Sequence, residues 1–221
     1  MITAEIDEII GDYIKAAKNA MKAGFDGIEI HAANGYLLDQ FINPDTNHRT
    51  DAYGGSIENR SRFVLEVVDA ISDAIGAERV GIRFSPYGTQ HDMSVFADIE
   101  DTFQYLFTEL SKRKTAYIHL NDQGTLYADH FGFIEKTRRW YEGTVVFAGF
   151  LTKERAEELI MKGLIDLAAF GRPLISNPDL VERLKNNHPL SPGIQQLFYG
   201  SSAEGYTDYK KHQELSENQK V

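Results

Sequence analysis

The sequence predicts an α/β protein built from parallel βα units. Short apolar runs alternate with longer amphipathic segments along the chain, and glycines punctuate many of the junctions. Strands that are regularly separated by helices form right-handed βαβ units and a parallel sheet. With 42% hydrophobic residues the chain can bury one core. We therefore expect one domain over residues 1–209 and a polar tail over residues 210–221.

The first βα unit is framed by glycines. An amphipathic helix opens the chain, because the isoleucines of residues 4–23 fall on one helical face, and Gly24 ends it. A short apolar strand follows and stops at His31, after which we expect a polar loop. The next helix, residues 57–75, has Ser56 as its N-cap and a continuous apolar face.

The alternation then continues to the last third of the chain. We expect strands over residues 80–84, 116–120, 145–148 and 167–170, and helices over residues 99–112, 131–141 and 153–162. A further helix begins at Asn177 and Pro178, as N-cap and first helical residue. Together with the strand before His31, this pattern gives five strands.

Parallel βα units leave two architectures open, the (β/α)8 barrel and the doubly wound sheet. No strand is followed by a G-x-G-x-x-G sequence, so a Rossmann dinucleotide site is unsupported. Polar residues stand at the carboxyl ends of the expected strands: His31, Arg83, Ser85, His119 and Asn121. In a barrel these residues would ring the mouth where barrel enzymes have their active sites.

Three hydrogen-bond donors follow the first strand within a few residues. His31, Asn34 and Tyr36 supply an imidazole, an amide and a phenol. Two N–H donors that converge on one oxygen stabilise negative charge there, and a nearby phenol can then deliver a proton. A structural histidine followed by an ordinary Asn-Gly turn is the alternative, and the local pattern leaves both open.

A much longer stretch carries a family resemblance. From His31 to Phe63 the chain reads HAANGYLLDQFINPDTNHRTDAYGGSIENRSRF. This resembles the Old Yellow Enzyme family of flavin-dependent ene-reductases, which carry His-x-x-Asn-Gly-Tyr-Leu-x-x-Gln-Phe followed by Asn-x-Arg-x-Asp-x-Tyr-Gly-Gly-Ser-x-Glu-Asn-Arg. The resemblance extends less densely through RVGIRFSPYG, VVFAGF, AAFGRPLISNPDL and FYGSSAEGYTDY. It implies FMN as cofactor, NAD(P)H as reductant and α,β-unsaturated carbonyl or nitro compounds as small-molecule substrates.

The resemblance also implies roles for the donor trio and for one arginine. His31 and Asn34 would bind the substrate oxygen, and Tyr36 would protonate the α-carbon of the substrate. Arg83 lies on the opposite face of its strand from the apolar residues that flank it. The matching arginine of the family contacts the flavin, whereas an ion pair with a barrel carboxylate is the alternative.

Further residues match the family's FMN site. Gly149 and Phe150 follow one late strand, and Gly171 and Arg172 follow the next, where barrels frequently bind phosphate. The resemblance assigns both turns to the FMN phosphate. Tyr199 matches a family aromatic residue near flavin and substrate, with ordinary packing as the alternative.

The strand count departs from the family pattern. A closed barrel has eight strands and usually about 250 residues, so we expect a partial (β/α)8 TIM barrel with strands 4 to 8 and with the N-terminal units missing. Such an arc leaves strand edges unpaired and apolar surface uncovered. We expect self-association or a chain that supplies the first three βα units. The alternative function is a non-catalytic remnant or binding module that cannot retain FMN.

Composition argues against several other classes of protein. The net charge of −10, with no large basic block, argues against nucleic acid and anionic membrane as partners. The chain has no cysteine, and His91, His119 and His130 lack metal-ligand spacing, so no metal is expected. Arg60 and Arg62 are interpreted as a solvated helix face. Without a membrane-length apolar run or a signal-peptide pattern, we expect a cytoplasmic protein.

Overall fold

The chain divides into two compact units. The computed structural model describes residues 2–122, 126, 128–200 and 202–212. The first unit comprises residues 1–150 and 156–168, and the second comprises residues 151–155 and 169–221. The predicted boundary between a barrel over residues 1–209 and a tail stays a prediction, because residues 213–221 of that tail lie outside the described residues.

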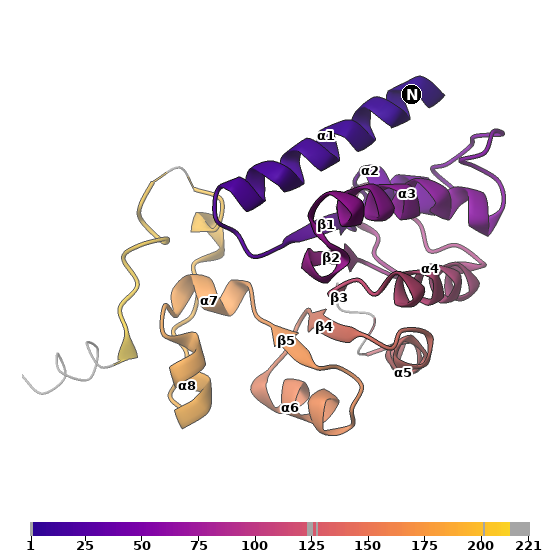
Figure 1. Cartoon of the computed structure of the whole chain (residues 1–221). Helices are drawn as coiled ribbons and strands as arrows, with labels where there is room; N and C mark the ends of the chain where they lie inside the picture. The colour runs from indigo at the N-terminus through magenta and orange to yellow at the C-terminus, as the bar shows by residue number, and fades with distance from the viewer. Residues whose placement is uncertain (1, 123–125, 127, 201, 213–221) are drawn as a thin grey trace, which may run out of the picture. The chain divides into compact units, whose positions relative to one another are not determined.

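The first unit is an α/β fold around one sheet (Figure 1). Its strands are β1 (Ile28–Ala32), β2 (Val80–Phe84), β3 (Tyr117–Asn121), β4 (Thr144–Ala148) and β5 (Leu167–Ala169). Its helices are α1 (Thr3–Lys22), α2 (Leu37–Ile42), α3 (Ile57–Ile75), α4 (Ile99–Arg113), α5 (Phe131–Trp140) and α6 (Lys153–Met161). Both β5 and α6 lie at the division between the two units.

The sheet has a consecutive strand order. The strands follow one another as β1-β2-β3-β4-β5, and the pairs from β1 to β4 are parallel. The register places Arg83 beside His31 on one neighbouring strand and beside His119 on the other. A doubly wound sheet reverses its strand order at a switch point, whereas a barrel does not. The consecutive order therefore favours the barrel alternative.

The two faces of the sheet differ in chemistry. Alternate strand residues on the face toward the helices are apolar and almost fully buried: Ile30, Ile82, Phe84, Ile118, Leu120, Val145 and Phe147. Burial of each such side chain stabilises the fold by about 1.5–3 kcal/mol. Figure 1 shows α3, α4 and α5 side by side along this sheet. The residues between them, which include Glu29, His31, Arg83 and His119, make the other face polar.

Most predicted elements are confirmed, with small differences near the site. The first strand does not stop at His31 but continues to Ala32. Where a polar loop was expected, α2 occupies Leu37–Ile42. At six residues this helix is too short for a clear periodic signal. Ser56 is confirmed as the N-cap of α3, since its Oγ accepts a hydrogen bond from the Asn59 N–H at 3.3 Å.

The interpretation of Arg60 as a solvated residue is wrong. Its side chain is 1% exposed within the first unit. It donates hydrogen bonds to the carbonyl oxygens of Ile42 and Gly55 and forms an ion pair with Asp98 at 2.7 Å. A charge can be buried in this way because its donors are paired. Arg60 thus links α3 to the end of α2 and the start of α4.

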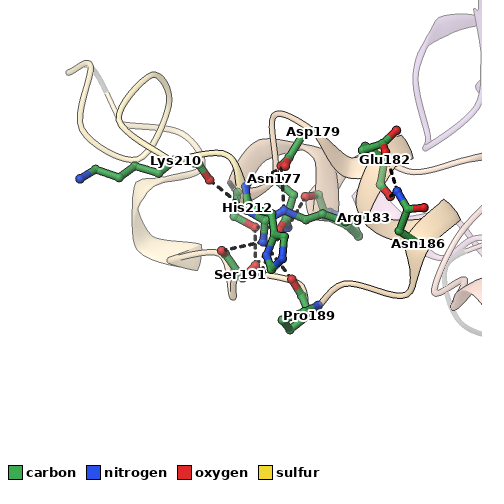
Figure 2. A network of polar contacts seen from close by, with 11 residues as sticks. Asn177, Asp179, Glu182, Arg183, Asn186, Pro189, Ser191, Lys210 and His212 are labelled. Carbon is green, nitrogen blue, oxygen red and sulfur yellow. Dashed lines mark hydrogen bonds and ion pairs between the residues drawn. The ribbon is translucent and has the colours of Figure 1, made fainter. Parts of the chain in front are cut away.

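The second unit contains two short helices, α7 (Arg172–Ser176) and α8 (Leu180–Asn186). The helix expected to begin at Asn177 and Pro178 begins instead at Leu180, with Asp179 as N-cap. Among the described residues of the second unit, Arg183 is the one charged residue that is fully buried, and Figure 2 shows its contacts. Arg183 contacts Asp179 at 2.7 Å and the carbonyl oxygens of Pro189 and Lys210 at 2.9 Å. These bonds connect α8 to the two segments that follow it.

Candidate active site

A tight turn after β1 presents the first candidate residues. Asn34 and Gly35 both have left-handed backbone conformations, with φ of 60° and 76°. A Cβ atom at Gly35 would lie 2.6 Å from the carbonyl oxygen of Gln90 and 2.9 Å from the His91 Cβ. Glycine is therefore required both by the backbone conformation and by the loop after β2, which packs on this turn.

The backbone of Asn34 is held from two sides. Its N–H donates to the Oγ of Ser85, which follows β2, at 2.7 Å. Its carbonyl oxygen lies 2.6 Å from the Nδ1 of His91. Because a carbonyl oxygen only accepts, Nδ1 carries the proton of this hydrogen bond. The turn is thus fixed to β2 and to the loop that follows it.

A chain of side-chain hydrogen bonds joins three strand ends. The Nη2 group of Arg83 donates to Asn121 Oδ1 at 2.7 Å, and the Nδ2 group of Asn121 donates to Asn34 Oδ1 at 2.8 Å. Arg83 and Asn121 come from neighbouring strands of the sheet, β2 and β3. The expectation that these strand ends meet at one edge is therefore confirmed for Arg83, Asn121 and the turn after His31.

The ring of Tyr36 contacts two imidazole rings. Its ring centroid is 5.4 Å from that of His31 and 4.9 Å from that of His91. The Tyr36 side chain is nevertheless half exposed, so its hydroxyl can be reached by a small molecule. The structure thus brings the predicted trio of His31, Asn34 and Tyr36 together around one turn.

The charge state of His31 suits a hydrogen-bond donor rather than a fixed cation. Burial lowers the pKa of His31 below its usual value, and the guanidinium of Arg83 lowers it further, whereas the Glu29 carboxylate acts in the opposite direction. A histidine with a lowered pKa is neutral at pH 7, with one N–H donor and one acceptor. His31 can therefore hydrogen-bond a carbonyl oxygen without a permanent charge.

The hydrogen-bond partner of Arg83 is an amide, whereas the alternative from the sequence was an ion pair with a carboxylate. Its Nη2 group binds Asn121, and its buried Nε atom has no hydrogen-bond partner among the described residues. A buried guanidinium donor of this kind suits an acceptor-rich ring such as the pyrimidine edge of a flavin. The residues present therefore fit FMN on this side of the sheet.

Sequence reasoning missed a second polar cluster on the same face. His119 Nδ1 lies 2.8 Å from Glu29 Oε2, and Tyr117 also hydrogen-bonds this carboxylate. Burial alone would raise the pKa of Glu29, but these hydrogen bonds and the nearby charge of Arg83 outweigh burial and lower it. The alternation of polar residues in β1 and β3 is the signal that could have indicated the cluster.

The turn after β4 contains Gly149 and Phe150, both exposed. A Cβ atom at Gly149 would lie 2.7 Å from the Cβ of Asp122. Glycine is therefore required here by the approach of the β3 end, whose Asp122 N–H donates to the Ala148 carbonyl oxygen at 2.7 Å. This requirement is structural and is compatible with a backbone N–H that binds phosphate.

In the second unit, Arg172 is the exposed first residue of α7 and follows Gly171. It helps line a hollow of about 330 Å³ together with Ser176, Asn177, Ser191 and their neighbours. Tyr199 is 97% exposed. Ordinary packing, the alternative for this residue, is therefore not seen within the unit.

Two further points concern the metal-ligating side chains and the helices in the part of the chain that the structure describes. No group of three or more histidine, aspartate or glutamate side chains there could hold a metal ion. Among the helices described, none combines the length and the apolar composition needed to cross a membrane.

The geometry defines a class of protein. A consecutive parallel sheet with polar donors gathered after the carboxyl ends of its strands is the arrangement found at the active-site mouth of (β/α)8-barrel enzymes. Comparison with known proteins agrees with this class. The chain belongs to the NADH:flavin oxidoreductase / NADH oxidase family, whose model matches residues 1–191.

Relatives within this family are similar over nearly the whole chain. Enoate reductase 1 of Kluyveromyces lactis is 44% identical over 95% of this chain, and 12-oxophytodienoate reductase 2 of Arabidopsis thaliana is 42% identical over 93%. The structure of morphinone reductase in complex with tetrahydroNAD is 43% identical over 96% of the chain, with a TM-score of 0.90. The resemblance to the Old Yellow Enzyme family is thereby confirmed.

The relatives are considerably longer than this sequence. The chain spans 57% of the Kluyveromyces enoate reductase, 56% of the Arabidopsis reductase and 57% of the morphinone reductase chain. Its five-stranded parallel sheet matches part of the barrel of such enzymes. The family uses FMN as cofactor with a nicotinamide reductant.

Proposed function

We propose that this chain forms the substrate-binding part of an FMN-dependent ene-reductase that reduces the C=C bond of α,β-unsaturated carbonyl or nitro compounds with NAD(P)H. The observation that carries the proposal is the donor cluster of His31, Asn34 and Tyr36 around one turn, linked by Asn121 to the guanidinium of Arg83. The printed names of the relatives, which include enoate reductase and a probable flavin mononucleotide-dependent alkene reductase, agree with it.

The residues of the chain supply hydrogen bonds and a proton. When bound, FMN supplies hydride transfer from NAD(P)H to the substrate. His31 and Asn34 hold the substrate oxygen through their N–H groups and stabilise the negative charge that develops on it, each by about 3 kcal/mol. Tyr36 donates its hydroxyl proton to the α-carbon. Because His31 is neutral, the oxygen is held without a preformed ion pair.

Further residues are proposed to bind the cofactor. The guanidinium of Arg83 would stabilise negative charge at the flavin pyrimidine ring. Arg172 would neutralise phosphate, with backbone N–H groups at Gly149 and Gly171 as donors. We assign Phe150 and Tyr199 to aromatic contacts with the flavin because both rings are exposed. The proposed reductant is NAD(P)H.

The remaining part of the barrel is proposed to complete the site. It would come from a longer or split chain or from association with another chain. The alternative is a non-catalytic module that keeps phosphate contacts but does not retain FMN. A visible flavin absorption band in the chain purified together with the rest of the barrel distinguishes these two functions, because only the first requires bound FMN.

The test of the donor cluster uses a ligand rather than turnover. We expect FMN-loaded protein to bind 4-hydroxybenzaldehyde, whose phenolate oxygen mimics an enolate, with a change in the flavin absorption spectrum. The His31→Ala, Asn34→Ala double variant should lose this binding by at least a hundredfold, because two oxyanion donors are removed. The control is His48→Ala, which removes an exposed imidazole outside the cluster. Unchanged phenol affinity in the double variant would contradict the proposal.

A further inference from the structure

The direction of each amide in the Arg83–Asn121–Asn34 chain follows from hydrogen-bond chemistry. An arginine only donates, so Asn121 must turn its Oδ1 atom toward Arg83, as the 2.7 Å contact shows. The NH2 group of Asn121 then faces Asn34, which must turn its own Oδ1 atom toward it, at 2.8 Å. The NH2 group of Asn34 is consequently on the side away from Asn121.

The hydrogen bonds to the backbone of Asn34 fix the position of the residue but not the direction of its side-chain amide. Ser85 and His91 hold the N–H and the carbonyl group of Asn34. Neither bond distinguishes the two ends of the side-chain amide, which differ only in whether they donate or accept. Asn121 makes that distinction, because its NH2 group tolerates only an acceptor opposite it.

The position of Asn121 suits this task. It is the last residue of β3, two residues beyond His119, so its side chain shares the polar face with Arg83. An apolar residue there would leave Arg83 Nη2 and Asn34 Oδ1 without the bonds they now make. A carboxylate would satisfy Arg83 but would attract the NH2 group of Asn34 and reverse the amide.

We propose that Asn121 is a positioning residue, which orients the Asn34 amide so that its NH2 group, and not its oxygen, faces the substrate oxygen. The effect on substrate binding rests on the proposed function, whereas the direction of the amide does not. With the amide reversed, Asn34 Oδ1 would face the substrate oxygen, so two acceptors would oppose each other there and the NH2 donor to the substrate would be lost. Asn121 would also couple the arginine assigned to the flavin to the residue assigned to the substrate.

The decisive variant is Asn121→Asp, which keeps the side-chain shape and the acceptor for Arg83 but removes the donor to Asn34. We expect its thermal stability to be retained, because the new carboxylate forms an ion pair with Arg83 in place of an amide contact. The affinity for 4-hydroxybenzaldehyde in FMN-loaded protein should nevertheless fall by about tenfold to a hundredfold. A merely structural role predicts the reverse, with stability lost and affinity retained. The matched control is Asn19→Asp on the exposed surface of α1, which makes the same charge change.

A double-mutant cycle separates the amide from the added charge. In an Asn34→Ala background the negative charge at residue 121 is still present, but no amide remains to be reversed. We therefore expect Asn121→Asp to lower the phenol affinity of the Asn34→Ala variant by less than threefold. An equal loss in both backgrounds would show that the charge acts directly on the ligand and would overturn the proposal.

A readout without FMN keeps this test separate from the proposed function. The side-chain amide of Asn34 gives two ¹H–¹⁵N signals in the labelled chain, which we expect to shift in Asn121→Asp and to stay in place in Asn19→Asp. If the protein binds neither FMN nor the phenol but these signals shift, the proposed function fails and the amide orientation stands. If they do not shift, Asn121 does not orient Asn34 and the inference fails.

Discussion

At the scale of single residues, a buried carboxyl group is hydrogen-bonded to the turn that contains Asn34 and Gly35. Asp39 is 7% exposed, and its Oδ2 accepts the Gly35 N–H at 2.9 Å and the Ser85 hydroxyl at 3.4 Å. Ser85 in turn accepts the Asn34 N–H. Burial raises the pKa of Asp39 to about 6, although the two hydrogen bonds act to lower it. The geometry of the turn is therefore linked to the protonation of one carboxyl group.

The stability contribution of Asp39 should depend on pH. Its pKa is higher in the folded than in the unfolded chain, so its contribution is fully present below the unfolded pKa of 3.8 and is lost as the pH rises through about 6. The loss amounts to about 3 kcal/mol. Asp39→Asn removes the titration, so between pH 4 and pH 7 the free energy of unfolding of the wild type should fall relative to the variant by most of this amount, about 2.4 kcal/mol. Urea unfolding at both pH values measures it.

An exposed aspartate provides the control for this prediction. Asp26→Asn makes the same substitution at an exposed position, and its unfolding free energy should follow the wild type across the pH range. If the curves of Asp39→Asn and the wild type run parallel between pH 4 and pH 7, the carboxyl group does not change its proton affinity on folding.

The residues that carry the site differ in how far the sequence predicts them. Strand alternation predicts that Arg83 lies on the polar face, which the structure confirms, whereas the motif names His31, Asn34 and Tyr36 as candidates whose roles stay predictions. The strand-end pattern places Asn121 at the same expected mouth but does not predict its bond to Asn34, because the two residues are 87 positions apart and become neighbours only through the sheet. Local patterns contain no information on such contacts until the strand order and register are known.

At the scale of elements, the buried arginine of α3 shows that helical periodicity can predict burial where charge does not. Arg60 precedes Phe63, Val64 and Val67 by three, four and seven residues, and this spacing puts it on the buried face of the helix. Its charge suggested solvent, but the periodicity indicated the core. The short helices α2 and α7, with six and five residues, gave no comparable periodic signal.

Replacement of this arginine should destabilise the first unit. Arg60→Met leaves the Ile42 and Gly55 carbonyl oxygens without their donor and separates α3 from Asp98. We expect the free energy of unfolding to fall by about 3–5 kcal/mol, the usual cost of removing one partner of a buried charged network. Thermal unfolding followed by circular dichroism measures the change.

The neighbouring arginine is a matched control. Arg62 is only partly buried and donates to the Ala52 carbonyl oxygen at 2.8 Å. Arg62→Met should therefore cost about 1 kcal/mol, the net value of an ordinary hydrogen bond. Equal losses for the two variants would show that burial of Arg60 adds nothing.

At the scale of the whole molecule, the strand order of the sheet indicates both the architecture and the strand edges that have no partner in the described part of the chain. Amphipathic alternation predicted the five strands, and the consecutive order selects a barrel-like arc over a doubly wound sheet. The sequence pattern could not select between them, because both architectures repeat the same βα unit. In that order β1 and β5 are terminal, so each has one neighbouring strand among the described residues.

We predict that the 221-residue chain by itself associates with another polypeptide. An exposed strand edge presents unpaired N–H and carbonyl groups, and a native stability of only about 5–15 kcal/mol leaves little to offset such a defect. The relatives, of which the chain spans 57%, have further residues that could pair with these edges. Size-exclusion chromatography with light scattering should show dimers or larger species. FMN titration should give stoichiometric binding only when the first three βα units of a relative are added in trans. A monomer that binds FMN stoichiometrically and reduces 2-cyclohexenone unaided would contradict this prediction, because it would show that β1 and β5 need no partner strands.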